Sequence, residues 1–394
     1  MRTQVGIIGA GPAGLFLAHL LHREGIESVV FEAHTRHYIE HRIRAGVLEY
    51  ATSELMKRIG LGDRLMREGL VHRGVELRFA GRSYRIDFEE LTGRAITVYA
   101  QQEVIKDLVE ARLAHGGEIL FEAEALSLSD IAAPRPRIHF RHNGAEHELE
   151  CDFIAGCDGF HGVARAAIPA REIAIYERVY PFGWLGILAE SKPASEELIY
   201  ANHDRGFALL SMRSPEISRL YLQCEPDEDL TQWPDERIWE ELHTRLNLGA
   251  ELIDGPILQR GVTPMRSFVA EPLRHGNLFL AGDSAHIVPP TGAKGLNLAV
   301  ADVRVLALGL TEHYRHNRSG LLDRYSDVCL RHAWKVQRFS WWMTSMLHKF
   351  PGDNAFDHRR QLAELDYLST SRAASQSFAE NYVGLDVLGV SMNV

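Results

Sequence analysis

The feature that most constrains the fold of this chain is its N-terminal stretch, where a short apolar run leads directly into a glycine-rich turn. Gln4 to Ala10 is typical of a buried strand, and the turn GAGPAG follows it. The helical pattern LFLAHLLHREG comes next, and a second strand, Ser28 to Phe31, ends at Glu32. This order predicts a βαβ unit that binds a dinucleotide.

Each residue type in this unit has a physical role in binding a dinucleotide. Gly9 allows the tight turn, Gly11 lets a pyrophosphate approach the backbone, and Gly14 lets the helix pack closely on the strand. Glu32 can accept hydrogen bonds from ribose hydroxyls. A glycine motif alone is weak evidence, but strand, helix, second strand and acid here follow in the required order, which disfavours a role without a nucleotide.

A second stretch with the same logic is NLFLAGDSAHIVPPTGAKGLN, residues 277–297. Leu278 to Ala281 indicates a buried strand that ends at Gly282 and Asp283, and a glycine- and proline-rich turn leads to a helical pattern starting near Leu296. A carboxylate and the free N–H groups of a helix N-terminus would then meet, where the hydroxyls and phosphate of a nucleotide can be held. By itself this could be a surface loop, but the N-terminal unit favours a nucleotide pocket.

Two further loops suit such a pocket. Arg42 and Arg44 alternate beside Gly46 and could hold phosphate or the edge of a ring, although solvated charges are the plain alternative. Asp158 lies in CDGFHG, directly after a strand pattern. An acid at a strand end again suits a cofactor crevice, but alone it is a weak signal.

Residues 175–265 change character and predict a mostly antiparallel sheet inserted into the nucleotide domain. Residues two apart on a strand share a face, so Ser211 and Arg213 could jointly hold an anion such as a carboxylate; an exposed sheet face is the alternative. Residues 72–99 are also strand-like, and Gln101 to Leu113 predicts a helix. From the residues alone, His72 is a strand histidine facing water.

The C-terminal third is helical in pattern, over Leu296 to Tyr314 and Leu321 to Phe350. The second range contains Trp341-Trp342-Met343, aromatic spacing that is typical of a core or a dimer face. The tail from Ala373 to Val394 is less regular in pattern.

Charge and cysteine content exclude several classes of function. The formal net charge of -10 argues against a nucleic-acid-binding protein, which needs a basic face. The cysteines form no CxxC pair and have no histidine partners at zinc spacing, so we expect buried small side chains, no metal site and a reducing cytoplasm. No signal peptide is visible, and no apolar run reaches the ~18 residues of a membrane helix. The four cysteines are Cys151, Cys157, Cys224 and Cys329.

Taken together, GAGPAG, the CDG turn and LAGDSAH resemble the three fingerprints of the class A flavoprotein aromatic hydroxylases. The likeness extends over almost the whole chain, through RIRAGVLE, DFIAGCDGFHG, ERVYPFGWLG, ELIYANH, PPTGAKGLN, RFSWWMTS and AENYVGL. Within that family the chain resembles members that hydroxylate 4-hydroxybenzoate at the 3-position. The resemblance implies FAD as cofactor, NADPH or NADH and O2 as co-substrates, a flavin hydroperoxide as the oxygen donor, and a homodimer.

The resemblance also implies the fold class, an α/β Rossmann-like FAD-binding domain with an inserted, mostly antiparallel substrate sheet and a helical C-terminal region. The expected domains are the first part of the FAD-binding domain at 1–174, the substrate domain at 175–265, a return segment at 266–297 and the helical interface region at 298–394.

The family's roles carry over to matching positions of this chain. The expected FAD contacts are Gly9, Gly11, Ala13, Gly14, Glu32, Arg42, Ile43, Arg44, Ala45, Gly46, Val47, Gln101, Asp158, Arg219, Asp283, Gly295, Leu296 and Asn297. The expected substrate contacts are Ser211, Met212, Arg213 and Tyr221 for the aromatic carboxylate, and Tyr200 and Pro290 for the phenol. The expected catalytic residues are Tyr200, Tyr382, His72 and Pro290, with His72 at the solvent end of a proton relay.

One departure concerns the nicotinamide cofactor. After Glu32, AHTRHY replaces the basic pair that NADPH-preferring relatives carry, which removes a bidentate partner for the 2′-phosphate. We therefore expect relaxed use of NADH and NADPH. The candidate contacts are His34, Arg36, His37, Tyr38, His161 and Arg266.

Two other functions stay open at this stage. A flavin-linked dehydrogenase or reductase on the same fold would need no phenolate relay and would work without oxygen. A flavin-binding redox sensor would use the aromatic helical region as an interaction surface and turn over slowly with every aromatic acid.

Overall fold

A computed structural model describes residues 1–42, 44 and 46–387. Two of the expected FAD contacts, Ile43 and Ala45, lie outside the described residues, as does 388–394. Within the described part of the chain, no helix is both long and apolar enough to cross a membrane.

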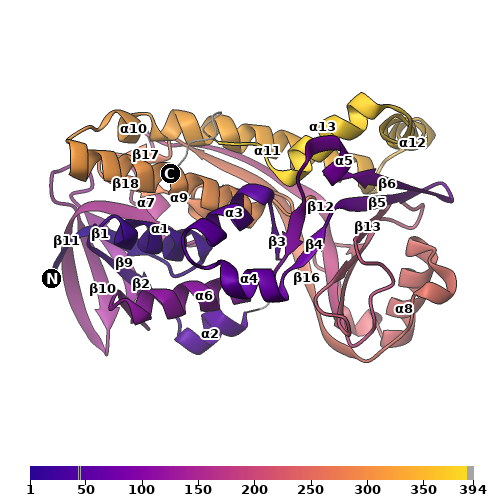
Figure 1. The fold of residues 1–394 in the computed structure, drawn as a ribbon, viewed down its shortest axis with the longest axis horizontal. Helices are drawn as coiled ribbons and strands as arrows, with labels where there is room; N and C mark the ends of the chain where they lie inside the picture. The colour runs from indigo at the N-terminus through magenta and orange to yellow at the C-terminus, as the bar shows by residue number, and fades with distance from the viewer. Residues whose placement is uncertain (43, 45, 388–394) are drawn as a thin grey trace.

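The first sheet carries the predicted nucleotide fold and lies at the left of Figure 1. Its main order is β17-β18-β11-β1-β2-β8, and the pairs β1–β2, β1–β11, β2–β8 and β11–β18 are parallel. Its strands are β1 (Arg2–Ile8), β2 (Ser28–Glu32), β8 (Glu118–Phe121), β9 (Glu124–Ser129), β10 (Arg137–His142), β11 (Ala145–Gly156), β17 (Arg274–His275) and β18 (Leu278–Leu280).

The register of this sheet positions the site. Ile8 pairs with Phe31 on β2 and with Gly156 on β11, and Gly156 in turn pairs with Leu280 on β18. Four parallel strands therefore end level with one another. The loops that follow them meet at one edge, where α/β sheets bind their ligands.

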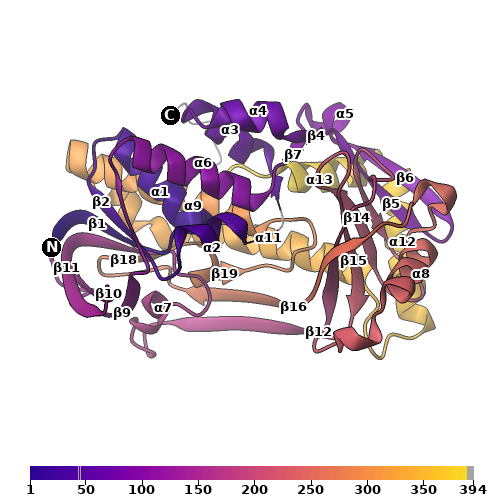
Figure 2. The same cartoon turned by 90° about the horizontal axis from the view of Figure 1, so that it is seen from below.

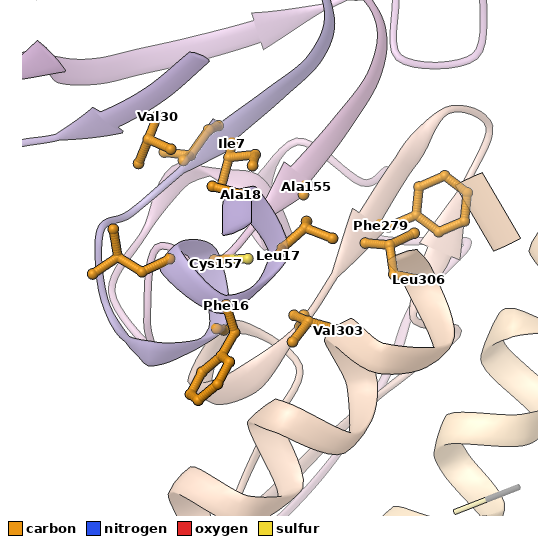
Figure 3. Packing of buried hydrophobic residues seen from close by; sticks show 14 of the residues in the cluster. Ile7, Phe16, Leu17, Ala18, Val30, Ala155, Cys157, Phe279, Val303 and Leu306 are labelled. Atoms are coloured by element: carbon orange, nitrogen blue, oxygen red, sulfur yellow. The ribbon is translucent and has the colours of Figure 1, made fainter. Parts of the chain in front are cut away.

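Helices α1 (Pro12–Arg23), α6 (Gln101–Ala114) and α9 (Gly295–His316) pack about this sheet. Pro12 opens α1 at a position where its missing N–H costs nothing, and the helix buries Leu15 to Ala18. Figure 3 shows Phe16 and Leu17 of α1 beside Val303 of α9. The helix after the glycine turn is thus locked to the helix that follows the second motif.

The second sheet lies at the right of Figure 1, in the order β19-β16-β12-β15-β14-β13-β5-β6. Its long strands β12 and β16 run side by side along the lower edge of Figure 2 and connect the two regions. Its strands are β5 (Gly74–Phe79), β6 (Arg82–Asp87), β12 (Ala174–Ala189), β13 (Leu198–Ala201), β14 (Ala208–Met212), β15 (Ser218–Cys224), β16 (Ile257–Glu271) and β19 (His286–Ile287). A small third sheet contains β3 (Val47–Leu48), β7 (Ile96–Val98) and β4 (Leu70–His72).

Strands from the N-terminal part of the chain complete the second sheet. β5 pairs in parallel with β13, with Val75 opposite Leu198, and β6 forms the edge. The substrate sheet therefore draws on residues 74–87 as well as on 175–265. The division of the chain into the four domains above stays a proposal.

The remaining helices lie in the connections and in the C-terminal third. The α-helices are α2 (Arg36–His41), α3 (Tyr50–Arg58), α4 (Gly62–Glu68), α5 (Phe88–Thr92), α7 (Val163–Ala166), α8 (Asp235–Leu246), α10 (Gly320–Asp323), α11 (Tyr325–Leu347), α12 (Ala355–Thr370) and α13 (Arg372–Val383). Three short 3₁₀ turns are η1 (Leu230–Gln232), η2 (Gly249–Glu251) and η3 (Gly282–Ser284).

One sequence expectation about helices needs correction, and one helix was not expected. The tail is not irregular over its first part, because α13 is capped by Ser371 and buries Phe378 and Tyr382 one turn apart. The substrate region is mostly antiparallel sheet as predicted, and within it α8 buries Trp239 and Leu242 against the second sheet. In both cases the packing surface, rather than local pattern, decides the structure.

Candidate active site

A cavity of about 880 Å³ lies at the edge where the parallel strands end. This volume is that of a site for a large ligand. Among the residues that the sequence nominated for FAD, those lining the cavity are Gly9, Gly11, Ala13, Glu32, Arg42, Arg44, Val47, Gln101, Asp158, Arg219, Asp283, Gly295 and Leu296.

The glycines of the first motif fit a phosphate-binding turn. A Cβ on Gly9, which has φ of 101°, would lie 2.3 Å from the carbonyl oxygen of Cys157, and a Cβ on Gly14 would lie 2.0 Å from that of Gly9. Gly11 has no neighbour within 4 Å of such a Cβ and lines the cavity. Gly9 and Gly14 therefore serve close packing, and Gly11 leaves room for a ligand against the backbone.

Two acids face the cavity from opposite motifs. Glu32 Oε2 accepts the N–H of Ala10 and its Oε1 accepts the N–H of His34, both at 2.9 Å, so the carboxylate is held across the glycine turn. Asp283 is exposed to the cavity but enclosed by protein elsewhere. This desolvation raises the pKa of Asp283, while the nearby His286 and Arg44 act to lower it.

Three of the expected FAD contacts do not line the cavity and act through packing. Besides Gly14, these are Gly46, where a Cβ would lie 2.3 Å from Cα of Ala100, and Asn297. The amide of Asn297 donates to the carbonyl of Val47 at 2.9 Å and accepts the N–H of Glu49 at 2.9 Å. Asn297 thereby joins the start of α9 to the loop that follows Arg44.

Two arginines, one lining the cavity and one behind its wall, have guanidinium nitrogens without a hydrogen-bond partner among the described residues. Arg219 lines the cavity, its guanidinium lies 5.1 Å from the ring of Tyr221, and its Nε and Nη1 have no hydrogen-bond partner among the described residues. The Arg213 guanidinium donates through Nη2 to the carbonyl of Arg44 at 3.4 Å, and its buried Nε has no hydrogen-bond partner among the described residues. Unpaired guanidinium donors beside a cavity indicate a site for an anion.

The expected carboxylate contacts lie close together on two neighbouring strands. Ser211 pairs with Arg219 across β14 and β15, and Met212 ends β14 directly before Arg213. Burial lowers the pKa of Arg213, while Tyr221 acts to raise it. Among the substrate candidates only Tyr221 and Pro290 line the cavity itself. Arg213 does not line the cavity. It hydrogen-bonds to Arg44 and interacts electrostatically with Tyr221, and both of these residues line the cavity.

Two buried tyrosines that are far apart in the sequence meet hydroxyl to hydroxyl. The oxygens of Tyr200 on β13 and Tyr382 on α13 are 2.6 Å apart, and each side chain is 1% exposed. Burial raises the pKa of both phenols. In Tyr200, hydrogen bonds with Tyr382 and the backbone of Gly292 act to lower the pKa but do not outweigh burial. Both therefore stay protonated at neutral pH and form a hydrogen-bonded chain.

His72 is buried, which corrects the expectation of a histidine that faces water. It is 0% exposed at the end of β4, and neither ring nitrogen has a hydrogen-bond partner in the described part of the chain. Burial lowers the pKa of His72 to about 4, and Glu197 opposes this only weakly. The ring is covered because β4 packs in the third sheet, so the histidine does not open directly to solvent.

This burial predicts a pH-dependent stability. An unfolded histidine titrates near pH 6.5, so between that value and about 4 the unfolded chain binds a proton that folded His72 does not. Its contribution to stability is complete above pH 6.5 and is lost as the pH falls. We expect His72→Leu to reduce the drop in the free energy of unfolding from pH 7 to pH 5 by about 2 kcal/mol.

Urea unfolding at the two pH values measures this effect, with the exposed His316→Leu as the matched control. An equal drop in wild type and His72→Leu would show that His72 titrates alike in both states.

The candidate nicotinamide contacts divide into two groups. His34 and Tyr38 have their rings 4.3 Å apart and line the cavity, as do His161 and Arg266. Arg36 and His37 do not line it, and the Arg36 guanidinium pairs with Glu40 at 2.7 Å. The cavity face of this group thus offers aromatic rings and one guanidinium.

Sequence reasoning missed two buried groups beside the site. Lys294 is 1% exposed and its ammonium donates to Glu49 Oε1 at 2.6 Å and to the carbonyls of Asn381 and Tyr382 at 2.6 and 2.9 Å. Burial lowers the pKa of this lysine and Glu49 opposes the shift. A lysine inside a glycine-rich turn, GAKG, was the available signal.

The second missed group is Trp184, which lines the cavity and lies 4.9 Å from the ring of Tyr221. Its indole N–H donates to Nε2 of the buried His348 at 2.7 Å, and His348 Nδ1 lies 3.0 Å from the carbonyl of Thr344. Burial lowers the pKa of His348 to about 3, so the ring is neutral and can accept that bond. No local sequence signal pairs these two residues.

The residues present fit FAD. A glycine turn with an open cradle at Gly11, acids at two strand ends and the start of α9 surround one cavity large enough for a dinucleotide. Searched over the described ranges, the structure holds no cluster of three histidine, cysteine or acidic groups that could bind a metal. The glycine turn, the two acids and the start of α9 make this cavity suited to a nucleotide cofactor.

Comparison with known proteins agrees with this geometry. Residues 2–340 match the FAD binding domain family, and the chain belongs to that family. Its sequence is 47% identical over 388 residues to the p-hydroxybenzoate hydroxylase of Acinetobacter baylyi, an alignment covering 98% of this chain and 96% of that protein. It is also 25% identical over 359 residues to the aklavinone 12-hydroxylase RdmE of Streptomyces purpurascens, covering 83% and 65% of the two chains.

The fold recurs in solved structures. The p-nitrophenol 4-monooxygenase PnpA of Pseudomonas putida DLL-E4 superposes with a TM-score of 0.85 over 99% of both chains, at 18% identity. The predicted family, the fold class and FAD as the cofactor are confirmed.

Proposed function

We propose that the protein is an FAD-dependent monooxygenase that uses NAD(P)H and O2 to hydroxylate 4-hydroxybenzoate at the 3-position, giving 3,4-dihydroxybenzoate. In balance, one aromatic C–H, one O2, one NAD(P)H and one proton give one phenol, NAD(P)⁺ and water. The relative from Acinetobacter baylyi supports the substrate. The observation that carries the proposal is the buried Tyr200–Tyr382 hydroxyl pair, which a dehydrogenase or sensor would not need.

FAD, when bound, supplies reduction by NAD(P)H and reaction with O2 to make an oxygen atom electrophilic enough to attack a ring. Gly9, Gly11 and Glu32 would hold it at the first motif, and Asp283 and the start of α9 at the second. In this proposal Arg42, Arg44 and Arg219 serve its charged and polar edges.

The chain's own residues would bind and orient the substrate. The guanidinium of Arg213, whose Nε has no partner among the described residues, would hold the carboxylate of the aromatic acid together with Ser211 and Tyr221. The phenol would then reach Tyr200 and Pro290 at the opposite end of the ring. Two anchors at opposite ends fix which ring carbon faces the oxygen.

The tyrosine pair would activate the substrate by moving its proton. A free phenol has a pKa of about 10 and is a poor nucleophile at neutral pH, whereas the phenolate is electron-rich. Tyr200 accepts the proton as it passes its own to Tyr382, across the 2.6 Å contact. His72 is proposed as the outer member of the relay, the role that the resemblance implies, and neither of its ring nitrogens has a partner among the described residues.

The buried walls would also exclude water. Trp184 is 3% exposed and is held by His348, while Tyr200 and Tyr382 are nearly inaccessible. Water at the reacting centre would discharge the oxygen as hydrogen peroxide. A closed site is therefore part of the proposed function.

For the nicotinamide cofactor, we infer relaxed use of NADH and NADPH. His34, Tyr38, His161 and Arg266 face the cavity and could contact it, but of these four only Arg266 is a guanidinium, and its Nη1 pairs with Glu177 at 3.2 Å. A strong site for the 2′-phosphate of NADPH needs arginine guanidinium groups whose paired N–H donors are free to bind the phosphate.

Oxygen uptake tests the function. It is recorded with NADH and with NADPH, each with and without 4-hydroxybenzoate, and the product is identified by chromatography. We expect substrate-stimulated uptake with both cofactors and stoichiometric 3,4-dihydroxybenzoate. Stimulated uptake that yields only peroxide would mean that the true substrate differs, and turnover without oxygen would select the dehydrogenase.

We also propose a homodimer in the cytoplasm. The four cysteines are free and buried, which fits a reducing compartment. Exposed apolar side chains gather over β12 and α11, at Tyr176, Trp334 and Trp341, which line a hollow of about 300 Å³. Grouped exposed aromatics of this kind are typical of a protein interface.

Replacing Trp341 by glutamate is expected to convert the dimer to a monomer, because a buried unpaired charge opposes association. Light scattering after size-exclusion chromatography measures the mass, with Tyr367→Glu, an exposed aromatic on α12, as the control. A wild-type monomer, or a dimer that survives Trp341→Glu, would contradict this surface.

A further inference from the structure

A buried histidine of the second nucleotide motif pairs with a buried acid of the helix that follows the motif, and neither residue has a part in the mechanism above. Asp302 on α9 and His286 on β19 are 1% and 2% exposed, and Asp302 Oδ2 lies 2.7 Å from His286 Nε2. Burial acts to lower the pKa of His286, but the charges of Asp302 and Asp283 outweigh it and raise the pKa. The two groups form a buried ion pair.

The same carboxylate oxygen also holds the motif's backbone. Asp302 Oδ2 accepts the N–H of Gly282 at 3.0 Å, and Gly282 has φ of 68°, in the left-handed region. Gly282 begins the η3 turn that presents Asp283 to the cavity. A hydrogen bond to a charged acceptor therefore fixes the residue that aims the cavity acid.

Asp302 joins two walls of the site. It lies on α9 two turns after Gly295 and Leu296, which line the cavity at the start of that helix. Through Gly282 it is tied to the turn after β18, which forms the neighbouring wall. The Asp302 side chain is thus one direct link between the two walls.

We propose that Asp302 and His286 are positioning residues for the cofactor, which hold the Asp283 turn and the start of α9 in the arrangement that binds FAD. This inference rests on the proposed FAD site. His286 lies 2.7 Å from the Asp302 carboxylate as its partner in the interior, and its charge also acts to lower the pKa of the neighbouring Asp283.

The chemistry of the pair supports positioning over bulk stability. A buried ion pair contributes little more to folding than apolar side chains of the same volume, and Asp302 Oδ1 has no hydrogen-bond partner among the described residues. Its specific effect is on geometry, through the Gly282 N–H and the His286 ring.

The test measures the affinity of the apoprotein for FAD by flavin fluorescence. Asp302→Ala removes both hydrogen bonds and leaves His286 without its counter-ion, so we expect the Kd for FAD to rise roughly tenfold to a hundredfold. Asp302→Asn retains an oxygen that can accept both N–H groups, and we expect it to restore the Kd to within about threefold of wild type.

A matched control separates positioning from loss of stability. Glu241 and Arg245 form a buried pair at 2.7 Å on α8, away from the cavity. Glu241→Ala should lower the Tm and leave the Kd for FAD unchanged. His286→Leu keeps the hydrogen bond from Gly282 to Asp302 and should raise the Kd for FAD about threefold to tenfold. This variant tests the inference even if Asp302→Ala does not fold. The double variant Asp302→Ala with His286→Leu should bind FAD with the same Kd as Asp302→Ala alone, because the two residues act as one unit.

Kd values for Asp302→Ala and His286→Leu within about twofold of wild type would overturn the inference. A loss of affinity for FAD in Asp302→Asn as large as that in Asp302→Ala would overturn it as well. Wild-type apoprotein that does not bind FAD would instead refute the proposed function, and the two failures are therefore distinct.

Discussion

Arg213→Ala is expected to weaken the binding of 4-hydroxybenzoate by more than the about 1.5–3 kcal/mol of one charged hydrogen bond, which is tenfold to over a hundredfold in Kd. The reason is the environment of the guanidinium. The Arg213 guanidinium donates to the carbonyl of Arg44 at 3.4 Å, and its buried Nε has no hydrogen-bond partner among the described residues. Without Arg213 the substrate carboxylate would enter the site partly unpaired, which adds a desolvation cost to the lost bonds.

Titration of flavin fluorescence with 4-hydroxybenzoate measures this effect. Arg213→Lys keeps the charge but loses the planar fork, so we expect an intermediate Kd. Arg237→Ala, an exposed arginine on α8, is the control for general effects of removing a guanidinium. An unchanged Kd in Arg213→Ala would place the carboxylate elsewhere, with the unpaired donors of Arg219 as the next candidate.

Tyr200→Phe is expected to separate NAD(P)H oxidation from hydroxylation. Phenylalanine keeps the ring and its packing but breaks the 2.6 Å contact with Tyr382, so the substrate phenol has no acceptor for its proton. Proton transfer by a positioned group contributes roughly a hundredfold or more to a reaction. The yield of 3,4-dihydroxybenzoate per NAD(P)H should therefore fall about tenfold or more, and hydrogen peroxide should take its place.

The control is Tyr180→Phe. Tyr180 is equally buried on the second sheet, and its hydroxyl lies 3.2 Å from Ser267, away from Tyr382. We expect this variant to remain coupled. Full product yield from Tyr200→Phe would count against the relay, and Tyr382→Phe should reproduce the uncoupling if the two hydroxyls act in series.

Sequence order was enough to predict that the residues proposed for FAD gather at one edge of the first sheet. Gly9, Glu32 and Asp283 each follow an apolar strand, and parallel strands that end level bring their following loops together. The local signals there are strong, because a tight turn or a close phosphate contact permits few residue types. The same logic explains why Gly14 acts by packing although it does not line the cavity.

The substrate half could not be predicted from spacing. Tyr200 and Tyr382 are 182 residues apart, and Tyr382 lies in a tail whose pattern does not show the α13 helix. Only the resemblance to known hydroxylases paired them. Likewise, the short strand of His72 gives no sign of burial, which comes from the third sheet and its surroundings.

Ion pairs inside the protein were also beyond sequence reasoning. Lys294 with Glu49, and His286 with Asp302, read as ordinary polar residues, because a sequence does not show which charges are enclosed together. The strand order had the same limit, since β5 joins β13 across more than a hundred residues. Long-range pairing is set by which surfaces complete the core, and local patterns do not contain that information.

The central claim, that the protein transfers an oxygen atom from O2 to the 3-position of 4-hydroxybenzoate, is tested most directly by isotope labelling. The purified enzyme with FAD, NADH and 4-hydroxybenzoate is supplied with ¹⁸O2, and the product is measured by mass spectrometry. The account predicts 3,4-dihydroxybenzoate carrying one ¹⁸O atom. Unlabelled 3,4-dihydroxybenzoate, with its new oxygen from water, or no hydroxylated product while NADH is consumed, would contradict it.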